Sequence, residues 1–174
     1  MELEILNFIQ SIRTDILDMF FIVYTTIGNH GEIWFVILGV MACFKKTRLM
    51  ALAGFIALAS EYLLVEGVLK HIFQRPRPFY VNPDIVLMIS EPSGYSFPSG
   101  HTASSFAVAW TLYMYNAPYK KVWIGLAALM GFSRLYVYVH FPTDVLAGAL
   151  LGMSIGFVVF KIFERIEEKK RLGI

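Results

Sequence analysis

The stretch that decides the fold is RLMALAGFIALASEYLLVEGVLKHI, at residues 48–72. As an α-helix it would be about 38 Å long, more than the roughly 30 Å of hydrocarbon in a bilayer. A second long apolar stretch lies at residues 142–163. Of all 174 residues, 57% are hydrophobic and 16% are charged, whereas soluble domains have about 25% charged residues. This composition excludes disordered, collagen-like and disulfide-rich proteins, and it predicts an integral membrane protein.

Further apolar stretches indicate more than two membrane spans. They lie at residues 32–44, 101–116 and 122–139. Residues 14–28 are also apolar, but they are short and Asp18 interrupts them. For that stretch we expect a half-inserted helix and keep a full span as the alternative. The fold class that we predict is all-α, a polytopic transmembrane helical bundle of five to six spans.

The two ends of the chain differ from these spans. In residues 2–13, leucine and isoleucine recur at helical spacing among polar and charged side chains. This pattern predicts an amphipathic amino-terminal helix that lies in the membrane interface. We expect residues 1–174 to form one integral-membrane domain, with residues 164–174 as a cytoplasmic tail.

Basic residues are distributed unevenly between the two sets of predicted helix ends. Ten fall at one set: Lys45, Lys46, Arg48, Lys120, Lys121, Lys161, Arg165, Lys169, Lys170 and Arg171. Four fall at the other set: Lys70, Arg75, Arg77 and Arg134. The positive-inside rule places the ten in the cytoplasm, so the polar loop at residues 73–99 is expected outside.

Three short segments on the predicted outer face carry residues suited to binding phosphate. They are KHIFQRPRP at residues 70–78, PSGH at residues 98–101 and SRLYVYVHFPTD at residues 133–144. Lys70, Arg77 and Arg134 are three cations with few acids expected around them in an apolar protein. Guanidinium groups can hold phosphate through two parallel hydrogen bonds. Ser99 and Gly100 lie where a helix is expected to begin, and backbone N–H groups there favour an anion.

The same segments contain two histidines and an aspartate that suit phosphoryl chemistry. Asp144 follows His140 by four residues, so its carboxylate can reach one ring nitrogen and leave the other free as a nucleophile or base. His101 can donate a proton to a leaving oxygen. A structural hydrogen bond or a zinc site are the alternatives. We disfavour zinc because three nearby cations would repel the ion, and we expect neither a metal nor another cofactor.

The motifs Lys-x6-Arg-Pro, Pro-Ser-Gly-His and Ser-Arg-x5-His-x3-Asp together resemble those of the type 2 phosphatidic acid phosphatase superfamily, over roughly residues 20–165. The resemblance implies a metal-independent lipid phosphatase in a helical membrane bundle. It implies that His140 attacks phosphorus and forms a phosphohistidine, that Asp144 orients His140, and that His101 protonates the leaving oxygen. It also implies five residues that bind the phosphoryl oxygens: Lys70, Arg77, Ser99, Gly100 and Arg134.

The resemblance further implies a lipid phosphomonoester or diphosphate as substrate, and we expect the reaction at the outer face of a bacterial cytoplasmic membrane. We favour undecaprenyl diphosphate, because the cations are crowded and Arg75 lies nearby in the sequence. The alternatives are phosphatidic acid and phosphatidylglycerophosphate. A non-catalytic lipid-phosphate binder or transporter is a different class, which would need the cations but not the histidines. We expect no nucleic-acid partner.

Three further features lie in the predicted spans. Glu66 precedes Lys70 by four residues, which predicts an ion pair that orients Lys70. Glu61 has no partner that its spacing suggests. Glycines recur every fourth residue at 148, 152 and 156, and this pattern predicts a close contact between two helices.

Overall fold

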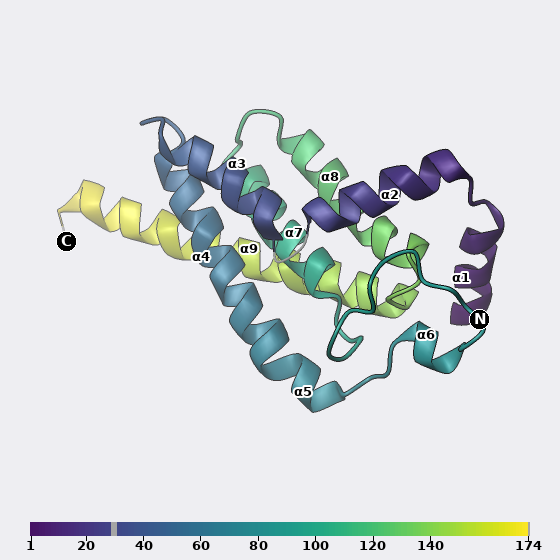
Figure 1. Cartoon of the computed structure of the whole chain (residues 1–174). Helices are drawn as coiled ribbons and strands as arrows, with labels where there is room; N and C mark the ends of the chain where they lie inside the picture. Colours follow the sequence, from purple (N-terminus) through teal and green to yellow (C-terminus); the bar gives the residue numbers. More distant parts are fainter. Residues whose placement is uncertain (29–30, 174) are drawn as a thin grey trace.

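The computed structural model describes residues 1–28 and 31–173, and within these ranges the chain forms helices and loops without a strand. The helical elements are α1 (Glu2–Ser11), α2 (Asp15–Ile27), α3 (Glu32–Ala42), α4 (Arg48–Leu64), the π-helical turn η2 (Val65–Leu69), α5 (Lys70–Phe73), α6 (Pro78–Val81), α7 (Gly100–Met114), α8 (Lys120–Tyr136) and α9 (Pro142–Leu172). Figure 1 shows how they are arranged. The prediction of an all-α fold is confirmed for the described part of the chain.

Two helical segments are long and apolar enough to cross a membrane, Arg48–Val81 and Pro142–Leu172. They contain the two stretches from which we predicted the fold. Helix α3 is apolar but has 11 residues, which span about 16 Å and do not cross the hydrocarbon alone. Helix α2 has 13 residues, which is also too short to cross the hydrocarbon alone. The number of five to six spans stays a prediction.

The contact between α7 and α9 depends on the glycines of α9. A Cβ atom at Gly148 would lie 2.6 Å from the carbonyl oxygen of Ser99, and one at Gly156 would lie 2.7 Å from that of Ala107. At Gly152 a Cβ atom would overlap the backbone of α7 in the same way. Because backbone cannot move aside as a flexible side chain can, only glycine fits at these positions. The close helix–helix contact predicted from the sequence is confirmed.

Helix α1 packs against the corner between α8 and α9. Leu6 is completely buried in a cluster with Tyr138, and Ile9 is buried in a neighbouring cluster. On the rest of the helix, Ile5 and Phe8 are exposed, which leaves an apolar surface that a membrane interface could cover. The amino-terminal helix therefore forms where the sequence predicts it, and its place in the interface stays a prediction.

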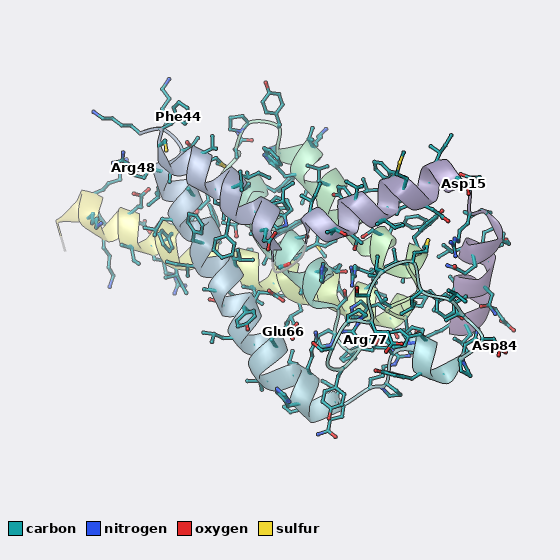
Figure 2. The ribbon with its side chains drawn as sticks, in the orientation of Figure 1. Asp15, Phe44, Arg48, Glu66, Arg77 and Asp84 are labelled. Atoms are coloured by element: carbon teal, nitrogen blue, oxygen red, sulfur yellow. The ribbon has the colours of Figure 1, made fainter. Side chains whose placement is uncertain are left out.

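The molecule has two distinct ends. Figure 2 shows Phe44 and Arg48 at the turn between α3 and α4, far from Arg77 and Asp84. The turn between α7 and α8 lies away from α6 and the amino terminus as well, and so does the carboxyl terminus (Figure 1). The ten basic residues that we expect in the cytoplasm form three groups, at residues 45–48, 120–121 and 161–171. All three groups lie apart from the loop at residues 73–99.

Candidate active site

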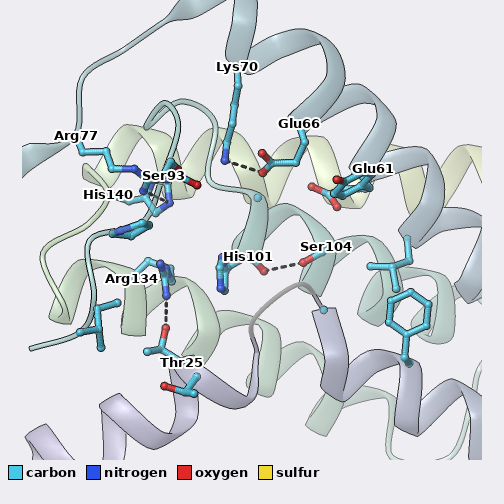
Figure 3. A pocket seen from close by; sticks show the side chains of 18 of the residues that line it. Thr25, Glu61, Glu66, Lys70, Arg77, Ser93, His101, Ser104, Arg134 and His140 are labelled. Carbon is cyan, nitrogen blue, oxygen red and sulfur yellow. Dashed lines mark hydrogen bonds and ion pairs between the residues drawn. The ribbon is translucent and has the colours of Figure 1, made fainter.

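Six of the eight predicted site residues line one cavity of about 990 Å³: Lys70, Arg77, Gly100, His101, Arg134 and His140 (Figure 3). The other two, Ser99 and Asp144, are completely buried. The three sequence segments are thus brought together, from the end of the α4–α5 helix, the start of α7 and the corner between α8 and α9. The roles of these residues stay proposals.

Lys70 reaches the cavity from the helix that begins at Arg48. The π-helical turn η2 lies just before it, and a π turn shifts the following residues around the helix axis relative to a regular α-helix. Lys70 Nζ donates to Glu66 Oε1 at 2.6 Å, so the predicted ion pair is confirmed. The Glu66 carboxylate lies over the first turn of α7, where a Cβ atom at Gly100 would approach Glu66 Oε1 to 2.7 Å. Gly100 therefore leaves room for this carboxylate.

Arg77 is fixed by backbone carbonyl groups on three sides. Its Nε donates to the carbonyl oxygen of Gly94, its Nη2 to that of Ser93 and its Nη1 to that of Val139, each at 3.0 Å. Prolines follow both Arg75 and Arg77 and favour extended backbone in the residues before them. Arg77 is 3% exposed, so its guanidinium is held rigidly at the wall of the cavity.

The contacts of His140 define its tautomer. Arg77 Nη1 lies 3.3 Å from His140 Nε2, and because a guanidinium only donates, Nε2 must be the acceptor. The hydrogen is then on Nδ1, which lies 3.4 Å from Ser96 Oγ and 3.6 Å from Asp144 Oδ2. Ser96 Oγ also donates to Asp144 Oδ2 at 2.5 Å. The ring therefore directs its Nε2 lone pair toward Arg77, which also lines the cavity, and its N–H toward Ser96 and the carboxylate.

The electrostatic surroundings keep this imidazole neutral. Burial lowers the pKa of His140 to about 3; the charges of Arg77 and Arg134 act in the same direction, and Asp144 opposes them. At neutral pH the contact with Asp144 is therefore that of an N–H group with a carboxylate rather than an ion pair. A neutral imidazole whose Nε2 carries a lone pair and no hydrogen is the form that attacks phosphorus.

Arg134 is the most deeply buried cation of the site. It is 2% exposed, and its Nη1 donates to Thr25 Oγ1. Its Nε is buried and has no hydrogen-bond partner among the described residues. Since buried donors are nearly always paired, this N–H group indicates a place for an acceptor that the protein does not supply.

Acidic residues also line the cavity, and here the sequence interpretation was wrong. We expected few acids near the cations, yet Glu61, Glu66 and Glu91 all lie on the cavity wall. Glu61 is 3% exposed, and its Oε1 has no partner in the described ranges. Glu66 pairs with Lys70, whereas neither Arg77 nor Arg134 forms an ion pair within residues 1–28 and 31–173. The positive charge available to an anion therefore comes from these two arginines.

Two residues that contact the site were missed or misjudged from the sequence. Ser96 was not singled out, because it lies in a loop without periodicity, although it is two residues before the Pro-Ser-Gly-His motif. Arg75 was counted among the crowded cations that favour a diphosphate. It does not line the cavity, and its Nη1 donates to Asp144 Oδ1 at 2.6 Å, behind the side of Asp144 that faces His140. Its charge is therefore not available to a diphosphate.

No group of three His, Cys, Asp or Glu side chains that could hold a metal ion occurs within the described residues. The two histidines of the cavity line it together with Arg77 and Arg134, whose positive charges would repel a divalent cation there. A metal-independent reaction stays a prediction.

The PAP2 superfamily model matches residues 48–168. The undecaprenyl-diphosphatase of Sulfolobus acidocaldarius is 38% identical over 134 residues, which are 75% of this chain and 63% of that relative. The chain thus spans less than two thirds of that relative's length. The crystal structure of Aquifex aeolicus LpxE superposes with a TM-score of 0.79 at 34% identity, covering 92% of this chain and 94% of that one. The PAP2-type phosphatidylglycerolphosphate phosphatase of Bacillus subtilis gives a TM-score of 0.75 at 28% identity, with 94% and 84% covered.

Proposed function

Because the chain belongs to the PAP2 superfamily, we propose that it is a membrane lipid phosphatase that works through a phosphohistidine on His140. The observation that carries this proposal is the contact of His140 Nε2 with Arg77 at the wall of a cavity where neither Arg77 nor Arg134 has a carboxylate partner in the described chain. A site that only bound lipid phosphate would need these cations. It would not need a nucleophilic tautomer supported by a buried carboxylate.

In the proposed reaction, the phosphoryl oxygens accept hydrogen bonds from Arg77, Arg134 and the backbone N–H groups at the start of α7. His140 Nε2 attacks phosphorus and forms an N–P bond, while the bond from phosphorus to the leaving oxygen breaks. His101 gives its proton to that oxygen. His101 then takes a proton from water, the hydroxide attacks the phosphohistidine, and inorganic phosphate leaves with His140 restored. Asp144 stabilises the Nδ1–H group while the ring carries the phosphoryl group.

For the substrate we propose a polyprenyl diphosphate of the undecaprenyl type. The cavity continues from the cations to an apolar wall formed by Phe35, Phe55, Leu58 and Tyr62, which suits a hydrocarbon chain. The name of the Sulfolobus relative supports the same substrate. Arg75 binds Asp144 and does not line the cavity, so the number of cations in the site does not by itself favour a diphosphate. The Bacillus phosphatase keeps phosphatidylglycerophosphate as the second candidate.

A comparison of substrates tests this proposal. Purified protein in one detergent is given undecaprenyl diphosphate, phosphatidic acid and phosphatidylglycerophosphate, and kcat/KM is measured from phosphate release. We expect the highest value for undecaprenyl diphosphate. A preference of more than about tenfold for either glycerophospholipid, roughly 1.4 kcal/mol in transition-state binding, would reverse the choice. Binding of all three without phosphate release would support the non-catalytic class.

We further propose that the site opens on the outer face of the cytoplasmic membrane, with the three groups of basic residues inside. Single cysteines at Val86 and Lys121, both exposed, should then react with a membrane-impermeant thiol reagent from opposite sides of intact cells and inverted vesicles. Cys43 is free and exposed, so the experiment uses a Cys43→Ser background. Labelling of both positions from the same side would contradict this topology.

A further inference from the structure

Arg75 joins the amino-terminal helix to the buried carboxylate behind His140. Its Nη1 donates to Asp144 Oδ1 and its Nη2 to Glu2 Oε2, both at 2.6 Å. Nη1 also donates to Thr143 Oγ1 at 2.7 Å. The guanidinium carbon lies 4.0 Å from the centre of the Phe141 ring, within the range of a cation–π contact. Arg75 thus touches the turn that carries His140 on several sides without entering the cavity.

Asp144 is completely buried, and three donors hold its carboxylate. Arg75 binds Oδ1, while Oδ2 accepts from Ser96 Oγ and from the backbone N–H of Phe141, at 2.5 and 2.8 Å. The Oδ2 atom is also the one that faces His140 Nδ1. The charged partner therefore binds one oxygen, and the other is left to orient the imidazole.

Glu2 binds Arg75 through Nη2, the guanidinium nitrogen that does not bind Asp144. Its Oε1 accepts from Thr143 Oγ1 at 2.6 Å and from the Thr143 N–H at 3.2 Å. Burial alone would raise the pKa of Glu2, but the hydrogen bonds from Thr143 and Arg75 outweigh it and hold that pKa below its ordinary value. Glu2, Arg75 and Asp144 thus form an alternating series of negative, positive and negative groups. The series fixes the direction of the Arg75 guanidinium.

We propose that Arg75, held by Glu2, is a positioning residue that fixes the Asp144 carboxylate, and through it the tautomer and direction of His140. This inference rests on the proposed phosphatase function. It assigns Arg75 to the reaction by way of Asp144 rather than by contact with the phosphoryl group. It also gives helix α1 a part in the site, because Glu2 is its first residue.

Without Arg75, the buried carboxylate keeps only the donors on Oδ2. The carboxylate is then free to rotate so that Oδ1 also finds a donor. His140 Nδ1, which lies 3.6 Å from Oδ2, is close enough to be drawn along with it. The ring shifts from the direction in which Nε2 attacks, so the chemical step slows while the phosphate contacts of Arg77 and Arg134 are kept. Lysine at position 75 supplies charge at a single point and cannot bind both carboxylates through a planar fork.

The test uses Arg75→Met, Arg75→Lys and Glu2→Gln, with kcat, KM and the inhibition constant of orthovanadate as readouts. We expect Arg75→Met to lower kcat about 10- to 100-fold, the range found when a group that orients a metal-binding side chain is removed. KM and the vanadate inhibition constant should stay within about twofold. Arg75→Lys should recover part of the rate, and Glu2→Gln should cause a smaller loss of the same kind.

Arg13→Met is the matched control. Arg13 forms an ion pair with Asp18 at 2.6 Å, and its side chain is 28% exposed against 27% for Arg75. It has no contact with Asp144 in the described chain, so kcat should stay within about twofold of wild type. A comparable loss in this variant would show that any ion pair near α1 produces the effect and would overturn the proposal.

A double-mutant cycle separates positioning from other roles. In an Asp144→Asn background, Arg75→Met should cost much less than in wild type, because the carboxylate that Arg75 fixes is already gone. Equal losses in both backgrounds, a raised vanadate constant with unchanged kcat, or no loss at all would each overturn the proposal. Wild-type protein that releases no phosphate from any lipid would instead refute the proposed function. If Arg75→Met does not fold, the same cycle with Glu2→Gln gives the result.

Discussion

Replacing His140 with asparagine is expected to lower kcat by roughly 10⁴-fold or more, about 5 kcal/mol in the barrier. Asparagine keeps a polar side chain in the buried corner but cannot accept a phosphoryl group. The loss should therefore appear in kcat rather than in substrate affinity. The measurements are phosphate release under saturating substrate and retention of ³²P on the acid-quenched protein, which wild type should show and the variant should lack.

His71→Asn is the matched control for this loss. His71 is exposed, contacts Tyr95 edge to face and does not line the cavity, so this variant should keep its rate. Melting temperatures in detergent separate a chemical loss from a folding defect. A His140→Asn variant that retains more than about one hundredth of the rate would contradict covalent catalysis. Wild-type activity that disappears with a chelator and returns with zinc would contradict it as well.

The fold class and the main site residues could be predicted because each rests on a local signal. Helical spacing predicted the Glu66–Lys70 pair, and the four-residue repeat of glycine predicted the contact of α9 with α7. Apolar runs bounded by charge and proline predicted where the longer helices begin, although α9 continues to Leu172, beyond the predicted end of the stretch at residue 163. The helix starts at Gly100 and Pro142 then bring His101 and His140 to the same end of the bundle.

Contacts between distant segments could not be predicted in this way. Arg75 and Arg77 are separated by one proline and have the same chemistry, yet Arg77 contacts His140 Nε2 and Arg75 contacts Asp144. Sequence spacing gives no direction for side chains in extended, non-periodic backbone. Glu2, the partner of Arg75, lies near the amino terminus, far from Arg75 in the sequence. Ser96, which binds Asp144, lies in a loop. Which arginine faces the phosphate is decided by tertiary packing.

Replacing Arg134 with methionine is expected to lower kcat/KM by about 100- to 1,000-fold while the protein becomes no less stable. Arg134 is 2% exposed with an unpaired Nε, and a buried donor without a partner destabilises a protein by about 1–3 kcal/mol. A methionine of similar length removes that penalty. It also removes a guanidinium that the phosphoryl oxygens need as negative charge develops, a loss of about 3–4 kcal/mol in the transition state.

The measurements are kcat/KM, the inhibition constant of orthovanadate and the melting temperature in detergent. Vanadate should bind more weakly to Arg134→Met, in contrast to Arg75→Met, because only Arg134 lines the cavity. Arg134→Lys keeps the charge but loses the planar fork, so its activity should lie between methionine and wild type. If Arg134→Met has a lower melting temperature and keeps its activity, Arg134 serves only to stabilise the fold through its hydrogen bond with Thr25. Lost activity with an unchanged or higher melting temperature would mean that the protein keeps a destabilising cation at this position for the phosphoryl group.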